Sequence, residues 1–201
     1  MPPTKKGTKA KMKIPAREEL IKIFGVIDPR SAFGKRDQAI IVFAANTGVR
    51  VSELCGLNVY TVMTSEGVRD AFDVPREWAK GKHVRQIPLT LSAQKAVLQL
   101  IRFNQARGFS TEPTAPLIQD RFHRRIPARS VQRMIQRYRE MAEASDLLTP
   151  HALRHYFADR ALRRCGNPRA VQTALGHRRL STVEVYTRAT PEDVRKAVGA
   201  A

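Results

Sequence analysis

Two histidines, an arginine and a tyrosine lie close together near the end of the chain, between His151 and Tyr186. On a helix, His151 and Arg154 would share a face, because residues three apart are neighbours on a helix surface. A guanidinium can bind two phosphate oxygens at once, and an imidazole can transfer protons near neutral pH. With His177 as a further donor and Tyr186 as a nucleophile, the set indicates phosphoryl transfer on a nucleic acid.

The charge of the chain favours a polyanionic partner. Its 201 residues include 36 Lys and Arg against 18 Asp and Glu, a formal charge of +18, and 42% are hydrophobic, enough for the core of one domain. An anionic membrane is the alternative partner, but no apolar run approaches the roughly 18 residues of a spanning helix. We therefore expect a nucleic acid as the partner, no membrane association and a cytoplasmic location.

A metal site is not expected. Cys55 and Cys165 are far apart in helix-like segments, which is typical of reduced core cysteines. His151 and His155 have the i, i+4 spacing of zinc ligands, but the segment HALRH lacks the glutamate of an HExxH motif. We expect chemistry that needs neither a metal nor another cofactor.

The elements that must position these residues are mostly helices. Apolar residues recur at helical spacing in AREELIKIFGVI and in DQAIIVFAANTG, which ends at Gly48. Ser52, Ser92 and Ser130 are expected to cap three further helices, the second of which ends at Gly108.

Glycine, proline and asparagine mark the helix boundaries near the C-terminus. Pro150 precedes the helix HALRHYFADRALRR, and Gly166 ends it. Asn167 is expected to cap the next helix, and Gly176 to close it. Pro191 begins a last short helix.

The segment between Gly67 and Leu89 is the one with β character, because its periodicity approaches two and it contains the turn-like KGKH. We expect a β-hairpin or a three-stranded sheet there. The fold class is therefore mainly α with a small antiparallel β-sheet (α+β), in one domain from residue 14 to 201. Residues 1–13 carry five lysines and are expected to be a disordered arm, either contacting phosphate or simply solvated.

A basic stripe is expected on the helix that follows Ala128. Arg129, Arg133 and Arg137 recur every four residues, with apolar residues elsewhere on the cylinder. Such a stripe is often only a solvated face. With the high net charge of this chain, we expect it to lie along a DNA backbone.

Taken together, the motifs closely resemble those of the tyrosine recombinase (phage integrase) family. The order is TGVRVSEL, a basic hairpin ending in RQIPL, HALRH, LGH and a tyrosine nine residues after that last histidine. Considered without the other motifs, Arg50 would be interpreted as a surface arginine, His177 as a helix C-cap and Tyr186 as a core or edge residue. The resemblance spans residues 14–198 and implies the tyrosine recombinase catalytic-domain fold.

The resemblance also implies roles for individual residues. Glu53 matches the acidic position that supports the site, and Lys82 and Arg85 would contact DNA. The catalytic positions of the family correspond to Arg50, Lys80, His151, Arg154, His177 and Tyr186.

The catalytic lysine is the one position that the motifs leave open. The family pattern resembles GKGxKxRxxPL, whereas this chain reads AKGKHVRQIPL. Alignment on Arg85 and Pro88 selects Lys80. Lys82 is the alternative, because a slide by two residues keeps the same side of a strand.

The activity that the resemblance implies is site-specific recombination of DNA, through a 3′-phosphotyrosyl intermediate and without metal, in a prokaryotic nucleoid or on a mobile element. The alternatives are a DNA-binding regulator that lacks productive catalysis and a type IB topoisomerase. A homotetramer on paired sites, weakly associated or monomeric without DNA, is the implied assembly. The N-terminal core-binding domain of most members is expected to be absent, as in the short stand-alone invertases of fimbrial promoters or in an excised catalytic domain.

Overall fold

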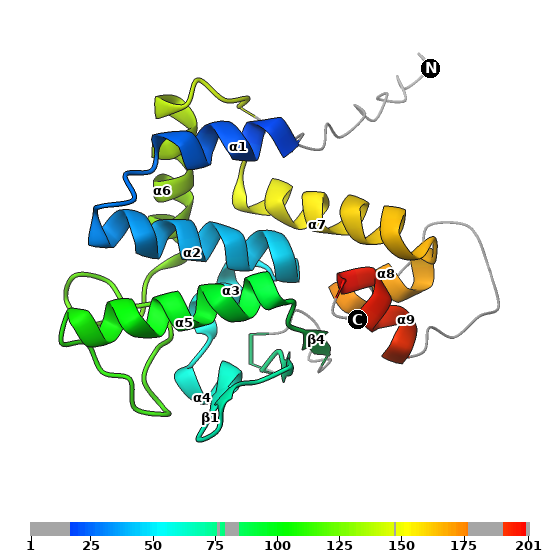
Figure 1. Cartoon of the computed structure of the whole chain (residues 1–201), viewed down its shortest axis with the longest axis horizontal. Helices are drawn as coiled ribbons and strands as arrows, with labels where there is room; N and C mark the ends of the chain where they lie inside the picture. The colour runs from blue at the N-terminus through cyan, green and yellow to red at the C-terminus, as the bar shows by residue number, and fades with distance from the viewer. Residues whose placement is uncertain (1–16, 76, 79–84, 147, 177–190, 200–201) are drawn as a thin grey trace, which may run out of the picture.

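Helices form most of the chain in the computed structural model, which describes residues 17–75, 77–78, 85–146, 148–176 and 191–199 (Figure 1). The helices are α1 (Arg17–Val26), α2 (Ala32–Thr47), α3 (Val51–Gly56), α4 (Val59–Val62), α5 (Leu91–Ala106), α6 (Ala128–Met141), α7 (Pro150–Cys165), α8 (Pro168–Leu175) and α9 (Pro191–Val198). The strands are β1 (Met63–Thr64), β2 (Gly67–Val68), β3 (Ala71–Asp73) and β4 (Gln86–Pro88). The predicted fold class is confirmed.

Helix α2 is the centre of the packing. It lies beside α5 and α7 (Figure 1), and Ile40, Ile41 and Phe43 are completely buried on it. A helix that is apolar on most of its surface must be covered on most sides, which explains why α2 takes the middle of the bundle. α6 packs against α1, α3 and α7, and so connects the helical core to the start of α7.

The glycine and asparagine signals in the sequence mark helix boundaries as predicted. Gly48, Gly166 and Gly176 follow α2, α7 and α8 in the left-handed conformation, with φ near 63° in each case. Asn167 caps α8, since its side chain accepts hydrogen bonds from the N–H groups of Arg169 and Ala170.

The predicted serine caps are wrong by two or three residues. α3 begins after Arg50, whose N–H donates to Oε2 of Glu53 at 2.7 Å. α5 is capped by Thr90, whose hydroxyl accepts from the N–H of Ala93, and α6 begins after Pro127 without a side-chain cap. Ser52, Ser92 and Ser130 lie inside the first turns, because the residue that precedes each helix is two or three positions before the serine.

The β structure is divided into two antiparallel pairs. β3 pairs with β4, with Phe72 opposite Ile87, and both of these side chains are buried. This confirms the hairpin expected before Leu89. The pair of β1 and β2 begins ahead of Gly67, so the described strands form two ladders and not one three-stranded sheet.

A smaller apolar cluster joins the three C-terminal helices. Phe157 and Ala161 of α7 pack with Leu175 of α8 and with Val194 and Val198 of α9. In this chain α9 therefore covers its own α7 and α8.

Within the described ranges, no helix is both long enough and apolar enough to cross a bilayer.

Gly48 fixes the end of α2 against α7, and we expect Gly48→Ala to destabilise the protein by roughly 2–4 kcal/mol. Its φ is +62°, and an added β-carbon would lie 2.4 Å from the ring of Phe157. Denaturant unfolding measures the effect. Gly25→Ala is the control: nothing lies within 4 Å of its added carbon, so stability should stay the same or rise. Equal losses in the two variants would refute this account.

Candidate active site

The carboxylate of Glu53 is the anchor of the candidate site. It is fully buried and accepts from the backbone N–H of Arg50 and from the Arg50 guanidinium, each at 2.7 Å. The first bond is possible because Glu53 lies one turn into α3, three residues after its N-cap. The start of α3 therefore holds the Arg50 side chain beside the carboxylate.

Arg85, which is 32 residues further along the chain, binds the same carboxylate. Its guanidinium donates to Oε1 of Glu53 at 3.0 Å and to Oε2 at 2.7 Å, and its Nε donates to the carbonyl of Ala174 at 3.2 Å. The expectation that Arg85 contacts DNA is therefore corrected. Its side chain is only 7% exposed, because its donors are used within the protein.

Arginine contacts also determine the ionisation of Glu53. Burial by itself would raise the pKa of this carboxyl group. The hydrogen bonds and positive charge of Arg85, together with the bonds from Arg50, hold the pKa below its ordinary value. Glu53 is therefore a carboxylate at neutral pH.

Arg154 is buried between the ends of two helices. Its guanidinium donates to the carbonyl of Gly48, after α2, at 2.6 Å and to that of Leu175, the last residue of α8, at 2.5 Å. Burial and the positive charges of Arg50 and Arg85 lower the pKa of Arg154. Since a guanidinium has five N–H donors, these two bonds leave donors for a ligand.

The first turn of α7 brings His151 to the same site. Thr149 caps the helix by accepting from the N–H of Ala152, and His151 is exposed immediately after it. Its ring lies edge-on to that of His155, with centroids 4.5 Å apart. His151 and Arg154 therefore share one face of α7, as their spacing predicts.

Arg50, His151 and Arg154 line one cavity of about 580 Å³. The described residues that line it include no Asp or Glu, so its surface is strongly positive. The first turn of α7 forms part of the wall, and the helix dipole favours an anion there. The lining residues are Arg50, Val51, Ser52, Gln132, Ile135, Gln136, Arg139, Leu148, Thr149, Pro150, His151 and Arg154.

Helix α6 borders this cavity and presents the predicted basic stripe. Arg129, Arg133 and Arg137 are exposed, whereas its apolar side chains are buried. The buried carboxylate of Asp37 on α2 accepts from the hydroxyl of Tyr138 at 3.0 Å and from Arg137 at 3.3 Å. These bonds fix the orientation of α6 and therefore the direction in which the stripe faces.

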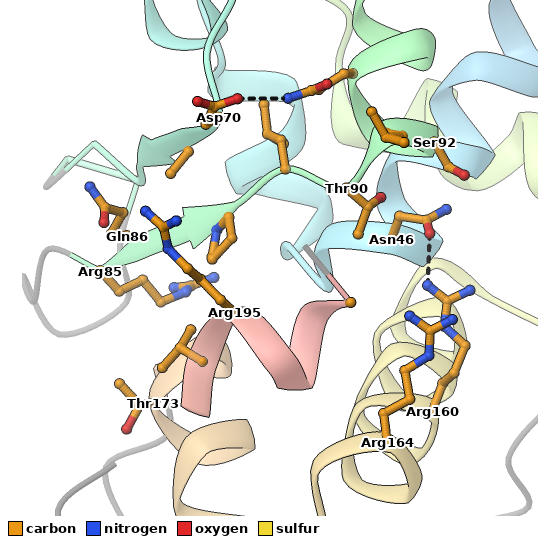
Figure 2. Close-up of a pocket in the computed structure, with 17 residues that line it drawn as sticks. Asn46, Asp70, Arg85, Gln86, Thr90, Ser92, Arg160, Arg164, Thr173 and Arg195 are labelled. Carbon is orange, nitrogen blue, oxygen red and sulfur yellow. Dashed lines mark hydrogen bonds between the residues drawn. The ribbon is translucent and has the colours of Figure 1, made fainter. Parts of the chain in front are cut away.

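A larger cavity, of about 890 Å³, lies between β4, α7 and α9 (Figure 2). Arg160 and Arg164 reach it from α7 and Arg195 from α9, and Arg160 donates to the Asn46 side chain at 2.7 Å. None of Arg50, His151 and Arg154 lines it. It is therefore separate from the candidate site, although Arg85 lies at its edge.

Several predicted residues lie outside the part of the chain that the structure describes. They include the two hairpin lysines, the second histidine of the set and the tyrosine, as well as the N-terminal arm. Among the described residues, no three His, Cys, Asp or Glu side chains are grouped as in a metal site. The predicted site residues outside the described ranges are Lys80, Lys82, His177 and Tyr186.

The sequence analysis missed two residues of the site and the role of a third. Gln132 and Arg139 line the cavity from α6, and Arg85 holds Glu53. The helical spacing of Gln132 and Arg139 relative to the buried Ile135 could have indicated their position. For Arg85 no local signal exists, because Glu53 is 32 residues away.

Comparison with known proteins gives one family over nearly all of the chain. The family model described as "Phage integrase family" matches residues 16–193. Tyrosine recombinase XerC of Syntrophus aciditrophicus is 34% identical over 181 residues, which cover 87% of this chain and 56% of the relative. Tyrosine recombinase XerA of Thermococcus kodakarensis is 35% identical over 184 residues, 90% of this chain and 60% of the relative. The chain thus spans little more than half the length of these relatives.

Solved structures share the architecture. The XerA recombinase crystal structure matches with a TM-score of 0.69 and 26% identity, over 96% of this chain and 64% of that one. The Tn1549 transposon integrase, solved in complex with transposon right-end DNA, matches with a TM-score of 0.65 and 25% identity, over 94% of this chain and 66% of that one.

We expect Glu53→Gln to lower the free energy of unfolding by roughly 3–5 kcal/mol, because two guanidiniums lose the buried charge that they share. The pKa of Glu53 is lowered in the folded state, so its contribution is complete above the ordinary carboxyl pKa and is lost as pH falls through the folded value. The difference between wild type and variant, measured by denaturant unfolding, should therefore shrink in acid.

The exposed Glu66 provides a matched control for this substitution. Glu66→Gln should change stability by less than about 0.5 kcal/mol at any pH. A Glu53→Gln protein that is as stable as the control at pH 7 would show that the shared carboxylate does not hold the site together.

Proposed function

This chain belongs to the phage integrase family, and on that premise we propose that it is a site-specific DNA recombinase that cleaves and rejoins DNA through a 3′-phosphotyrosyl link. The observation that carries the proposal is the cavity in which Arg50, His151 and Arg154 meet. It is positively charged and large enough to admit a backbone phosphate. The named relatives are tyrosine recombinases.

Within the described residues, the positive charges of the site outnumber its negative charges. Arg50, Arg85 and Arg154 are grouped around the single carboxylate of Glu53. A phosphate between Arg50 and Arg154 would supply the missing negative charge and would accept the remaining guanidinium N–H bonds. The same contacts would strengthen as charge develops on the phosphoryl oxygens in the transition state.

The proposed reaction is a transesterification. The phenol oxygen of Tyr186 attacks a DNA phosphorus and forms the O–P bond, while the bond to the 5′-oxygen breaks. Tyr186 needs a general base because a phenol has a pKa near 10, and His151 is proposed to take its proton. His177 donates a hydrogen bond to the phosphoryl group. Religation reverses each step, so no high-energy cofactor and no metal is required.

The departing 5′-oxygen must gain a proton as it leaves. We assign this role to Lys80, with Lys82 as the alternative, because both lie in the sequence between β3 and β4 and an ammonium group can act as a general acid. The site residue Glu53 supports catalysis indirectly by holding Arg50 in place.

Double-stranded DNA is the proposed substrate and partner. The exposed arginines of α6 lie on the helix that borders the cavity, so they can bind backbone phosphates on either side of the cleaved one. We propose a homotetramer on paired sites, formed in the cytoplasm on nucleoid or mobile-element DNA. The Lys-rich segment 1–13 adds sequence-independent affinity, and residues 14–201 supply the catalytic domain.

We expect the wild-type protein, mixed with sheared genomic DNA of its source and quenched in detergent, to retain DNA covalently at a discrete sequence. Tyr186→Phe should retain none, since it lacks the nucleophilic oxygen, yet should bind DNA with unchanged salt dependence. Sequencing of the retained fragments measures both the linkage and the site.

Other outcomes of this experiment would overturn the proposal. Salt-sensitive binding by both proteins with no adduct from either would indicate a DNA-binding regulator. In a parallel assay on a supercoiled plasmid that carries the retained sequence, relaxation without recombinant product would indicate a topoisomerase. Adducts that persist in Tyr186→Phe would place the nucleophile elsewhere.

Substitution of each hairpin lysine by methionine should identify the general acid. We expect Lys80→Met to slow single-turnover cleavage by about 100-fold, in the usual range for loss of a general acid, and to leave DNA affinity within about twofold. Lys82→Met should mainly weaken binding. The opposite pattern would assign the acid to Lys82, and equal small losses would exclude a lysine acid.

A further inference from the structure

His155 contains the one buried polar side-chain atom that is unsatisfied within the described residues. Its Nε2 is shielded from solvent and has no hydrogen-bond partner, although the rest of the residue is half-buried. A buried polar atom without a partner costs free energy, so its presence calls for an explanation. The neighbouring imidazole, His151, is the candidate general base.

The state of His155 follows from its surroundings. Burial, then the charges of His151 and Arg154, lower the pKa of His155, so the ring is neutral at pH 7. A neutral ring with its proton on Nε2 would bury an unsatisfied donor, whereas the proton on Nδ1 leaves Nε2 as a bare acceptor. The tautomer with Nδ1–H is therefore favoured.

The geometry allows this acceptor to serve His151. The two ring centroids are 4.5 Å apart with the planes at 87°. An N–H···N bond between two imidazoles, with nitrogens about 2.9 Å apart, places the centroids at about 5 Å. His151 is exposed, and the energy minimum of its χ2 angle is broad. A rotation of its ring, with a slight increase in the distance between the two rings, therefore makes the bond.

We propose that His155 is a positioning residue for His151: its neutral imidazole offers the lone pair of Nε2 to an N–H of His151 when His151 takes the proton of Tyr186. The proton remains on His151 and returns to the tyrosine oxygen on religation. His155 gains no proton at any step, and its acceptor stabilises the imidazolium and fixes the direction of the ring. The inference rests on the proposed function, because it concerns the base of that reaction.

The charges around the pair are consistent with one added proton, which His151 holds. Arg154 lies on the same helix, Arg50 faces the cavity from the start of α3, and Arg139 faces it from α6. The carboxylate of Glu53 is already bound by arginines. The cations disfavour a second proton on the two rings.

Nitrogen-15 NMR of the wild-type protein without DNA tests the state of His155 independently of any cleavage. We expect the neutral Nδ1–H form at pH 7, with the Nε2 resonance shifting when His151 becomes protonated. The exposed His123 is the internal control, and its resonances should not respond to the state of His151. A protonated Nε2 at pH 7 would overturn the proposal.

Two substitutions test the role in the reaction. His155→Phe keeps an aromatic ring against His151 but removes the acceptor. The protonated form of His151 then becomes less stable, which makes neutral His151 a weaker base. We expect adduct formation to slow about tenfold at neutral pH and the acid limb of the pH–rate profile to move to lower pH. His155→Gln supplies an amide oxygen and should retain at least about half of the wild-type rate, with an unmoved acid limb.

The outcomes separate this inference from the recombinase function itself. Wild-type rates and profile in His155→Phe would refute the positioning role. Equal losses in both variants with an unmoved acid limb would show that His155 only packs. Absence of adducts from the wild-type protein would refute the recombinase function, and the NMR result would still decide whether His155 is the acceptor.

Discussion

The shared carboxylate of Glu53 is the interaction on which the candidate site depends. It joins the N-terminus of α3 to the chain before β4, and Arg85 extends the connection to the last turn of α8. A buried carboxylate is stable only when its charge and its lone pairs are both matched. Here two guanidiniums and one backbone N–H do so. The same bonds that neutralise Glu53 therefore also set where Arg50 faces the cavity.

Helix ends provide the second constraint. Arg154 is held by carbonyls at the ends of α2 and α8, where unpaired C=O groups carry partial negative charge. Gly48 and Gly176 end these helices in the left-handed conformation, and neither position has room for a β-carbon. Arg85 lies against Gly176, so both glycines place an arginine of the site as well as ending a helix.

The third constraint is the attachment of α6 to the core. Asp37 on α2 binds Arg36, Arg137 and the hydroxyl of Tyr138, and Arg36 also lies over the rings of Phe33 and Phe103. This polar network fixes a helix that is polar on most of its surface and buries only one apolar stripe. The cavity and the exposed arginines of α6 are therefore held in one rigid arrangement.

The sequence by itself determined the family, the mainly helical class, the ends of α2, α7 and α8 and the amphipathic pattern of α6. These features depend on local preferences: glycine tolerates a positive φ, asparagine caps and helical spacing groups apolar side chains. The tertiary structure was required for the partners of Arg85 and Arg154 and for the starts of α3, α5 and α6. It was also required for the contact of His151 with His155, whose Nε2 has no hydrogen-bond partner among the described residues. Arg85 reads as a DNA contact until Glu53 and Ala174, 32 and 89 residues away, are placed beside it. Contacts at such separations depend on how the helices pack, and no local pattern of residues encodes them.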